Sequence, residues 1–226
     1  MLLGIDTSGA VSVAVAREGE VLAVRTDTRA RHHDEVLLAL VDETLQAAGA
    51  SRTQLTGVVA GRGPGPFTGL RVGLVSARTI ASVLQVPLHG LCSLDALAHQ
   101  ALAAHPGAEP LTVGVALDAR RREVYHARYR RAEDGRLERT GGPAVAAPAD
   151  VAAELTACDL LVGSGTALYP DLLPATDPLE HVDAGHLLLA AVECLAAGED
   201  LSDTAPLYLR EPDAAKPTAR KSALGR

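Results

Sequence analysis

The same order of strands and helices occurs twice along the chain, and this repetition constrains its fold more than any other feature. In the first half, an apolar strand ends at Asp6 and a later strand ends at Gly61. In the second half, the matching positions are Asp118 and Gly163. Alternating apolar residues after each aspartate predict a β-meander, and a helix is expected before each glycine turn. The sequence therefore predicts two similar α/β lobes in a chain of 226 residues.

The spacing of apolar residues also places the individual elements. The expected helices span residues 33–48, 70–84, 94–104, 148–155 and 186–197. Further strands are expected at 11–16, 21–25, 88–92 and 123–130, and a last strand at 206–210. Ser93 is a favoured N-cap residue, so it is expected to cap the helix that follows it.

Two such lobes, each with an aspartate and a later glycine turn, are similar to the duplicated ribonuclease-H-like fold. This is the actin-like (ASKHA) architecture, in which nucleotide lies in the cleft between the lobes. We expect an N-terminal lobe at residues 1–104, to which residues 205–215 can return, and a C-terminal lobe at 105–204. Residues 211–226 are expected to form a flexible tail. A fold of this kind says little about function by itself.

Composition and charge exclude several classes of function. The net charge is −7, whereas a protein that grips nucleic acid alone usually carries a basic surplus. The arginines at 120–122 and 128–131 are therefore first interpreted as solvated side chains. The longest apolar runs are shorter than a membrane span, and the three cysteines lack metal-ligand spacing, so reduced thiols are expected. A cytoplasmic location follows by elimination.

A rigid glycine- and proline-rich loop, Gly61–Gly73, joins a strand to a helix and is a natural place for a ligand or partner site. It lacks the Gly-Lys-Ser/Thr of a Walker A loop. Pro66 stands where a Rossmann loop has its third glycine. The loop is therefore expected to position the helix after it rather than to cradle phosphate.

The turn made by Asp6, Thr7 and Ser8 is compatible with the first nucleotide turn of an actin-like protein. The second turn, which begins at Asp118, has neither a glycine nor a hydroxyl residue. We therefore expect a vestigial nucleotide turn, with no tightly bound cofactor. The histidines and carboxylates at 32–35 are adjacent in a helix start and point to different sides, so no metal site is expected.

Five segments of the chain resemble one known family. They are residues 5–8, 31–35, 61–71, 118–125 and 206–210. These segments are similar to the TsaB (YeaZ) family, a subunit of the bacterial machinery that makes threonylcarbamoyladenosine next to the anticodon of transfer RNAs. The resemblance spans nearly the whole chain, with Pro66 where the family more often has Ser.

The resemblance implies a non-catalytic role. In TsaD, the catalytic relative, two histidines four residues apart hold a metal; the matching positions here are Ser93 and Leu97. The implied partners are a TsaD-like catalytic subunit and a TsaE-like ATPase, with transfer RNA reached only through the complex and no membrane. The only cofactor that the resemblance allows is ATP or ADP, bound at the interface with the partner.

Pairing is expected to use the two amphipathic helices of the N-terminal lobe, and the chain alone is expected to form a homodimer. The candidate contacts are His33, Glu35, Val36, Leu40, Phe67, Arg71, Leu74 and Arg78. The alternative is an autonomous enzyme on the actin-like fold, either an ATP-dependent kinase or a hydrolase. The absent histidine pair and the poor second turn favour the subunit.

Overall fold

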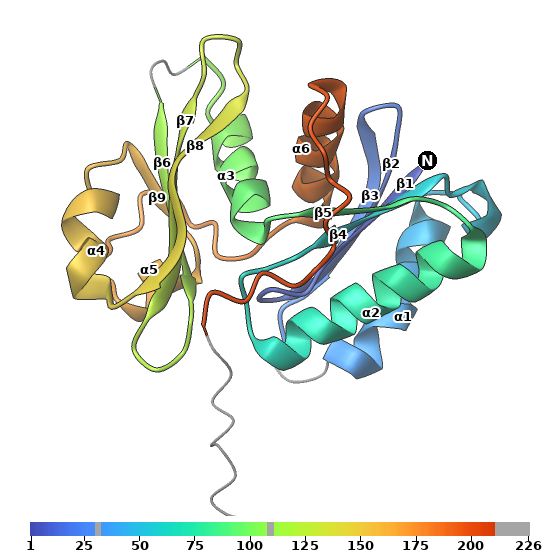
Figure 1. Ribbon diagram of the computed structural model, residues 1–226, viewed down its shortest axis with the longest axis horizontal. Helices are drawn as coiled ribbons and strands as arrows, with labels where there is room; N and C mark the ends of the chain where they lie inside the picture. The colour runs from blue at the N-terminus through green and yellow to red at the C-terminus, as the bar shows by residue number, and fades with distance from the viewer. Residues whose placement is uncertain (30–32, 108–110, 211–226) are drawn as a thin grey trace, which may run out of the picture.

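The computed structural model describes residues 1–29, 33–107 and 111–210, with the backbone alone described at 33–35. Two mixed sheets stand on either side of two helices, α3 and α6 (Figure 1). The first sheet has the order β3-β2-β1-β4-β5. Its strands are β1 (Leu2–Asp6), β2 (Val11–Arg17), β3 (Glu20–Asp27), β4 (Gly57–Gly61) and β5 (Leu88–Leu91). β1, β2 and β3 pair antiparallel, whereas β4 lies parallel to both β1 and β5.

The second sheet repeats this plan with four strands in the order β8-β7-β6-β9. Its strands are β6 (Thr112–Asp118), β7 (Val124–Arg131), β8 (Leu137–Ala146) and β9 (Leu160–Val162). β6 and β9 pair parallel, as β1 and β4 do in the first sheet. The repeated strand order confirms the predicted duplicated actin-like fold.

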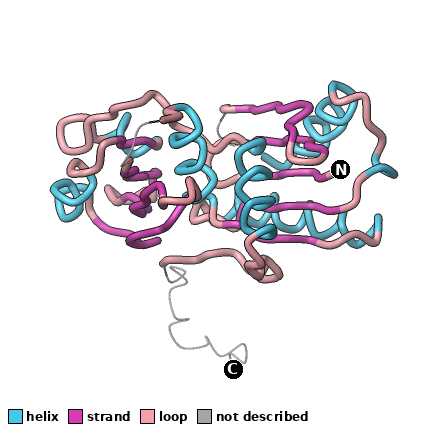
Figure 2. Tube along the Cα trace, turned by 90° about the horizontal axis from the view of Figure 1, so that it is seen from above, coloured by secondary structure: helices cyan, strands magenta, loops and turns pink. Residues whose placement is uncertain are grey.

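The five helices that the periodicity predicts are present, with ends that shift by up to three residues, whereas the short helix at Ser164–Leu168 was not predicted. The helices are α1 (His33–Ala47), α2 (Phe67–Leu84), α3 (Ser93–Ala104), α4 (Pro148–Leu155), α5 (Ser164–Leu168) and α6 (Ala184–Ala196), with a 3-10 turn at Arg52–Gln54. α1 and α2 cover the outer face of the first sheet (Figures 1 and 2). α2 alone among the described helices is long and apolar enough for a membrane span, and its Leu70, Leu74 and Ala77 are buried, as in the core helix of a globular protein.

One hydrophobic cluster joins the two lobes, beside a second cluster in the first lobe and a third in the second lobe. Buried side chains from the first sheet, both central helices and the second sheet form a single cluster that includes Val59, Leu94, Val115 and Leu188. α6 packs on β1, β2 and β3, although its residues fall within the 105–204 segment expected to form the second lobe. A methyl group at Gly4 would lie 2.8 Å from Cγ of Leu188, so a glycine in β1 allows this close approach.

A buried carboxylate joins three elements where β1 ends. Asp6 accepts hydrogen bonds from the Ser8 backbone (2.9 Å), the Ser8 hydroxyl (2.6 Å) and the Ser93 hydroxyl (2.5 Å). The Ser93 hydroxyl also accepts from the Gly63 backbone N–H at 3.1 Å. Burial raises the pKa of Asp6, while these hydrogen bonds act in the opposite direction. We call this set of contacts the Asp6 bracket; it ties β1 to the loop after β4 and to the start of α3.

The glycines of the 61–73 loop follow from this packing. A methyl group at Gly61 would lie 1.8 Å from a carboxylate oxygen of Asp6, and one at Gly73 would lie 2.2 Å from the Thr7 hydroxyl. The Thr7 hydroxyl also donates to the Gly69 carbonyl at 2.8 Å. Gly61 at the end of β4 and Gly73 in the second turn of α2 therefore allow both elements to approach the end of β1 closely.

Two histidines meet between the central helices. The Nδ1 atoms of His99 in α3 and His186 in α6 lie 3.0 Å apart, and Nε2 of His99 lies 3.2 Å from Glu193. Burial, and next the neighbouring His99, lower the pKa of His186, which Asp183 partly offsets. A single hydrogen bond between two ring nitrogens requires one of them to accept, so protonation of both rings removes it.

Two local predictions are wrong. Residues 206–210 form no strand, because only Leu207 donates a backbone bond toward the first sheet, to the carbonyl of Arg62 just beyond β4. Ser93 is the first residue of α3 rather than its N-cap, which is Cys92. The Ser93 hydroxyl bonds to Asp6 instead of a backbone group of its own helix.

The Asp6 bracket predicts that Gly61→Ala will be costly. The added methyl group must displace a buried carboxylate, so we expect a loss of about 3 kcal/mol in the free energy of unfolding. Urea denaturation measures this loss. Gly49→Ala is the matched control: it has open space but a φ of 61°, so we expect a loss of about 1 kcal/mol from the backbone alone. Equal losses in the two variants would contradict the bracket.

The histidine pair predicts a loss of stability in mild acid. Because the folded state lowers the pKa of His186, the unfolded chain binds more protons as the pH falls below about 6.5, and unfolding is favoured. We expect the urea midpoint to fall between about pH 7.5 and about pH 5.5, and His186→Asn to reduce that fall. An undiminished fall in His186→Asn would refute the assignment.

Candidate functional site

A cleft of about 560 Å³ lies between the lobes, at the ends of β1 and β6. Its lining includes Ser8, Thr68, Asp118, Arg120, Ser164 and His181. In the first turn, the side chains of Asp6, Thr7 and Ser8 are buried and make hydrogen bonds within the chain. In the second turn, Arg120 pairs with Asp118 at 3.1 Å. The side chains of Asp6, Thr7 and Ser8 in the first turn, and of Asp118 and Arg120 in the second, are thus engaged with the protein itself.

The first turn is therefore placed beside the cleft, but its side chains serve packing. Ser8 donates both its N–H and its hydroxyl to Asp6, and the hydroxyl of Thr7 points to the Gly69 carbonyl. The Asp118 backbone N–H donates to the hydroxyl of Ser164, at 3.1 Å. A hydroxyl at the start of α5 thus accepts a hydrogen bond from the end of β6, where the second turn begins.

The predicted partner residues divide into exposed and buried groups. On α2, Arg71 and Arg78 are exposed and Phe67 is 45% exposed, as a docking surface requires. Leu74 is only 7% exposed and packs in the core of the first lobe, so this residue is not available to a partner. This is a correction to the expected set.

On α1, the predicted residues contribute less than expected. Val36 and Leu40 are half-buried against the first-lobe core. The side chains of His33 and Glu35 lie outside the described residues. The apolar stripe of this helix is therefore directed mainly into the chain's own core.

Three apolar side chains that the periodicity did not single out are the most exposed on this face. Leu38 on α1 is 59% exposed, and Val75 and Val83 on α2 are 63% and 75% exposed. Val75 and Val83 lie eight residues apart and so share one face of α2. Leu38 is the second of two adjacent leucines, and only the packed structure shows that Leu37 faces the core.

An apolar groove of about 240 Å³ separates α1 from α2, with Leu38 and Val83 in its lining. The remaining lining residues are Leu3, Val41, Leu45, Arg52, Leu55, Thr79, Ile80 and Leu84. Exposed apolar side chains beside such a groove are typical of a surface that binds another helix. This α1–α2 face is the strongest candidate for a functional site.

One end of the face carries an aromatic stack. Phe67 stacks on Tyr208 with 5.3 Å between ring centroids, and the guanidinium of Arg71 lies 3.8 Å from the centroid of the Phe67 ring. Arg71 also donates to the Tyr208 hydroxyl at 3.2 Å. Farther along, Arg78 donates to Thr204 at 3.2 Å. Residues 201–210 therefore run beside α2 and hold its exposed arginines.

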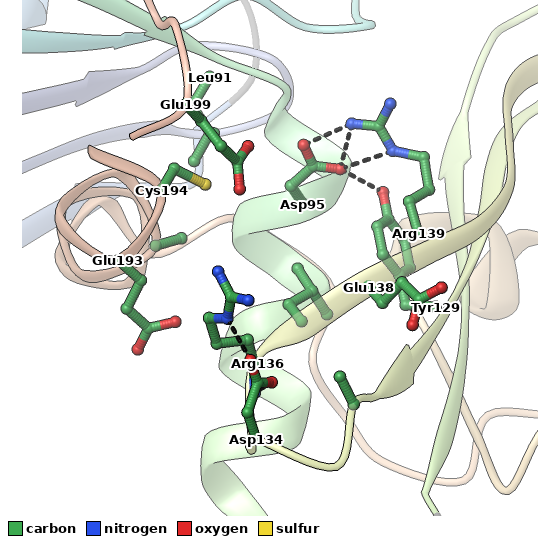
Figure 3. A pocket seen from close by; sticks show the side chains of 13 residues that line it. Leu91, Asp95, Tyr129, Asp134, Arg136, Glu138, Arg139, Glu193, Cys194 and Glu199 are labelled. Carbon is green, nitrogen blue, oxygen red and sulfur yellow. Dashed lines mark hydrogen bonds and ion pairs between the residues drawn. The ribbon is translucent and has the colours of Figure 1, made fainter. Parts of the chain in front are cut away.

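A second pocket, of about 490 Å³, lies between α3, α6 and the β7–β8 hairpin (Figure 3). In it Asp95 accepts a bond from the Tyr129 hydroxyl at 2.7 Å and from Arg139 at 2.6 Å. Burial raises the pKa of the nearby Cys194 thiol to about 12, so it is not a reactive thiolate. The charged groups of this pocket mainly join α3 to the second sheet.

The comparisons with known proteins agree with this architecture. The family model described as TsaD, tRNA N6-adenosine threonylcarbamoyltransferase, matches residues 20–172. The tRNA threonylcarbamoyladenosine biosynthesis protein TsaB of Escherichia coli is 34% identical over 76% of this chain and 74% of its own length. An uncharacterized protein of Mycobacterium tuberculosis is 41% identical over 96% of this chain and 95% of its own.

Solved structures give the same result. YeaZ from Pseudomonas aeruginosa superposes with a TM-score of 0.77 at 31% identity, covering 92% of this chain and 99% of that one. The likeness thus extends over both lobes, including the central helices. The chain belongs to the TsaB (YeaZ) family.

Proposed function

We propose that this chain is a non-catalytic subunit that pairs with a TsaD-like catalytic subunit in the synthesis of threonylcarbamoyladenosine on transfer RNA. Its relatives from three bacteria carry names that refer to this biosynthesis. In the proposed assembly the chain acts as a scaffold and activator, in the cytoplasm, and a TsaE-like ATPase is the third protein.

The observation that carries the proposal is the exposed apolar α1–α2 face. Leu38, Val75 and Val83 present their side chains to solvent beside an apolar groove. These side chains do not contribute to the chain's own core, and a partner helix would cover them. The same face supports a homodimer when the catalytic subunit is absent, because two copies can bury the same patch symmetrically.

A catalytic role for the chain itself is less well supported. The two positions that match the metal-binding histidines of TsaD are Ser93 and Leu97, and both are fully buried. Ser93 is engaged by Asp6 and Gly63, so its hydroxyl belongs to the Asp6 bracket. The interlobe cleft offers Arg120 paired to Asp118 where a kinase needs freely available groups for phosphate and metal.

The alternative is an autonomous ATP-dependent kinase or hydrolase on the same fold. It draws support from the cleft of about 560 Å³ between the lobes. Binding of ATP or ADP alone does not separate the two proposals, because a subunit could also bind nucleotide where it meets its partner. The two proposals therefore differ in whether the chain alone turns over ATP.

Charge on the α1–α2 face is expected to break the pairing. We predict that Leu38→Glu with Val83→Glu raises the dissociation constant for the TsaD-like subunit by at least about tenfold, because the carboxylates would be buried without partners. Analytical ultracentrifugation and native mass spectrometry measure both this pairing and the homodimer. Leu168→Glu changes an equally exposed leucine on the second lobe and should alter neither. Pairing that survives the double substitution would place the interface elsewhere.

The purified chain alone is expected to hydrolyse ATP no faster than a heat-treated sample. Adding it to the TsaD-like subunit, the TsaE-like subunit, threonylcarbamoyl donor and transfer RNA is expected to raise product formation by at least about tenfold, since activation requires the assembled pair. Rapid ATP turnover by the chain alone would instead favour the autonomous enzyme.

A further inference from the structure

The loop between β6 and β7 contains three consecutive arginines in an unusual backbone conformation. Arg120, Arg121 and Arg122 have φ angles of 60°, 55° and 62°. The left-handed region is unfavourable for side chains other than Gly, Asn and Asp, and a run of three such residues is rare. All three arginines are exposed.

The loop is held in this shape from both ends and from the side. The Ala119 N–H donates to Glu123 at 3.0 Å, and the Glu123 N–H donates back to Arg120 at 3.0 Å. Arg210 lies beside the loop, donates to the Ala119 carbonyl at 3.2 Å and forms an ion pair with Glu123. The contacts of Arg210 link the loop to the segment that carries Tyr208, and through it to Arg71.

The charge of this loop is incompletely balanced. Several exposed arginines elsewhere pair with carboxylates, such as Arg130 with Glu138 at 2.7 Å. In the loop, Arg120 pairs with Asp118, but no ion pair is formed by Arg122 within the described part of the chain. Arg71 likewise pairs with no described carboxylate. Arg122 is thus an exposed cation without a described ion-pair partner, in a protein whose net charge is −7.

The chemistry of the loop indicates a polyanion rather than a protein partner. Its flanking apolar residues, Ala119 and Val124, are buried, so the loop exposes charged groups and no apolar centre. Protein interfaces usually have such a centre, whereas phosphate is bound by the planar fork of arginine. Arginine side chains supply many of the hydrogen bonds that proteins make to the phosphates of nucleic acids.

We infer that the Arg120–Arg122 loop contacts the sugar–phosphate backbone of the transfer RNA in the assembled complex. This inference rests on the proposed function, because the acidic chain alone has too little positive charge for strong RNA binding. The loop adds a backbone contact to an assembly whose catalytic subunit holds the reacting nucleotide. It therefore contributes affinity and position, without base specificity.

The test is transfer RNA binding by the full chain together with its TsaD-like partner, measured by fluorescence anisotropy at several salt concentrations. The variant is Arg121→Asn with Arg122→Asn, since Asn adopts the left-handed conformation readily and should preserve the loop. We expect binding about tenfold weaker, and a log–log salt slope smaller by roughly 1 to 2. Its urea midpoint should be unchanged or higher.

Two matched variants serve as controls. Arg121→Lys with Arg122→Lys keeps the charge and should retain most of the affinity. Arg17→Asn with Arg25→Asn removes two exposed arginines from the far strands of the first sheet and should leave binding and salt slope as in the wild type. An equal loss of transfer RNA affinity in every variant would show that binding depends on the overall charge rather than on this loop, and it would overturn the inference.

The remaining outcomes separate this inference from the proposed function. If the wild-type chain stimulates modification but the Asn pair binds transfer RNA as the wild type does, the loop inference is wrong and the proposed function stands. If the Asn pair instead weakens pairing with the TsaD-like subunit without RNA present, the arginines contact protein, which also overturns it. If the wild-type chain neither pairs nor stimulates, the proposed function fails, and the loop inference fails with it.

Discussion

The structure depends on one buried carboxylate. Asp6 ends the first strand and receives three hydrogen bonds from Ser8 and Ser93, so it joins β1 to the start of α3. A buried charge of this kind is tolerated only when its hydrogen-bonding capacity is filled. The loop after β4 must then pass within contact distance of the carboxylate, and this requires glycine at position 61. The direction in which α2 leaves the sheet follows from the same packing.

The same constraint determines how the polar side chains at the end of β1 are used. The groups that could face a nucleotide at the end of β1 are turned inward by the bracket, and Arg120 in the second lobe is paired with Asp118. The central helices bury the space between the sheets in one core. Most of the exposed apolar side chains of the first lobe lie on α1 and α2. The proposed partner site therefore lies on the outer face of the first lobe.

Much of the fold could be predicted from sequence, because the apolar periodicity of a strand or helix is a local property. The helix at 148–155 has the predicted ends, α3 begins one residue earlier than expected, and α2 begins three residues earlier. Predictions that depend on contacts between residues far apart in the sequence were less accurate. Ser93 was expected to cap its own helix, but a carboxylate from β1 competes for its hydroxyl. Residues 206–210 alternate like a strand but lie beside α2, where Tyr208 stacks on Phe67 and accepts a hydrogen bond from Arg71.

The candidate site likewise combines features that can be predicted from the sequence with features that only the packed structure determines. From its sequence alone, the chain is identifiable as a duplicated α/β protein with a rigid joint before its second helix and no metal-binding histidine pair. Each of these features is recognised from particular residue types at a fixed spacing along the sequence. Only the tertiary structure decides which apolar residues stay exposed: Leu74 is buried and Val75 is not, although they are neighbours on one helix. Exposure depends on which helix face meets the sheet, and this is determined by the Asp6 bracket and by packing from distant parts of the chain.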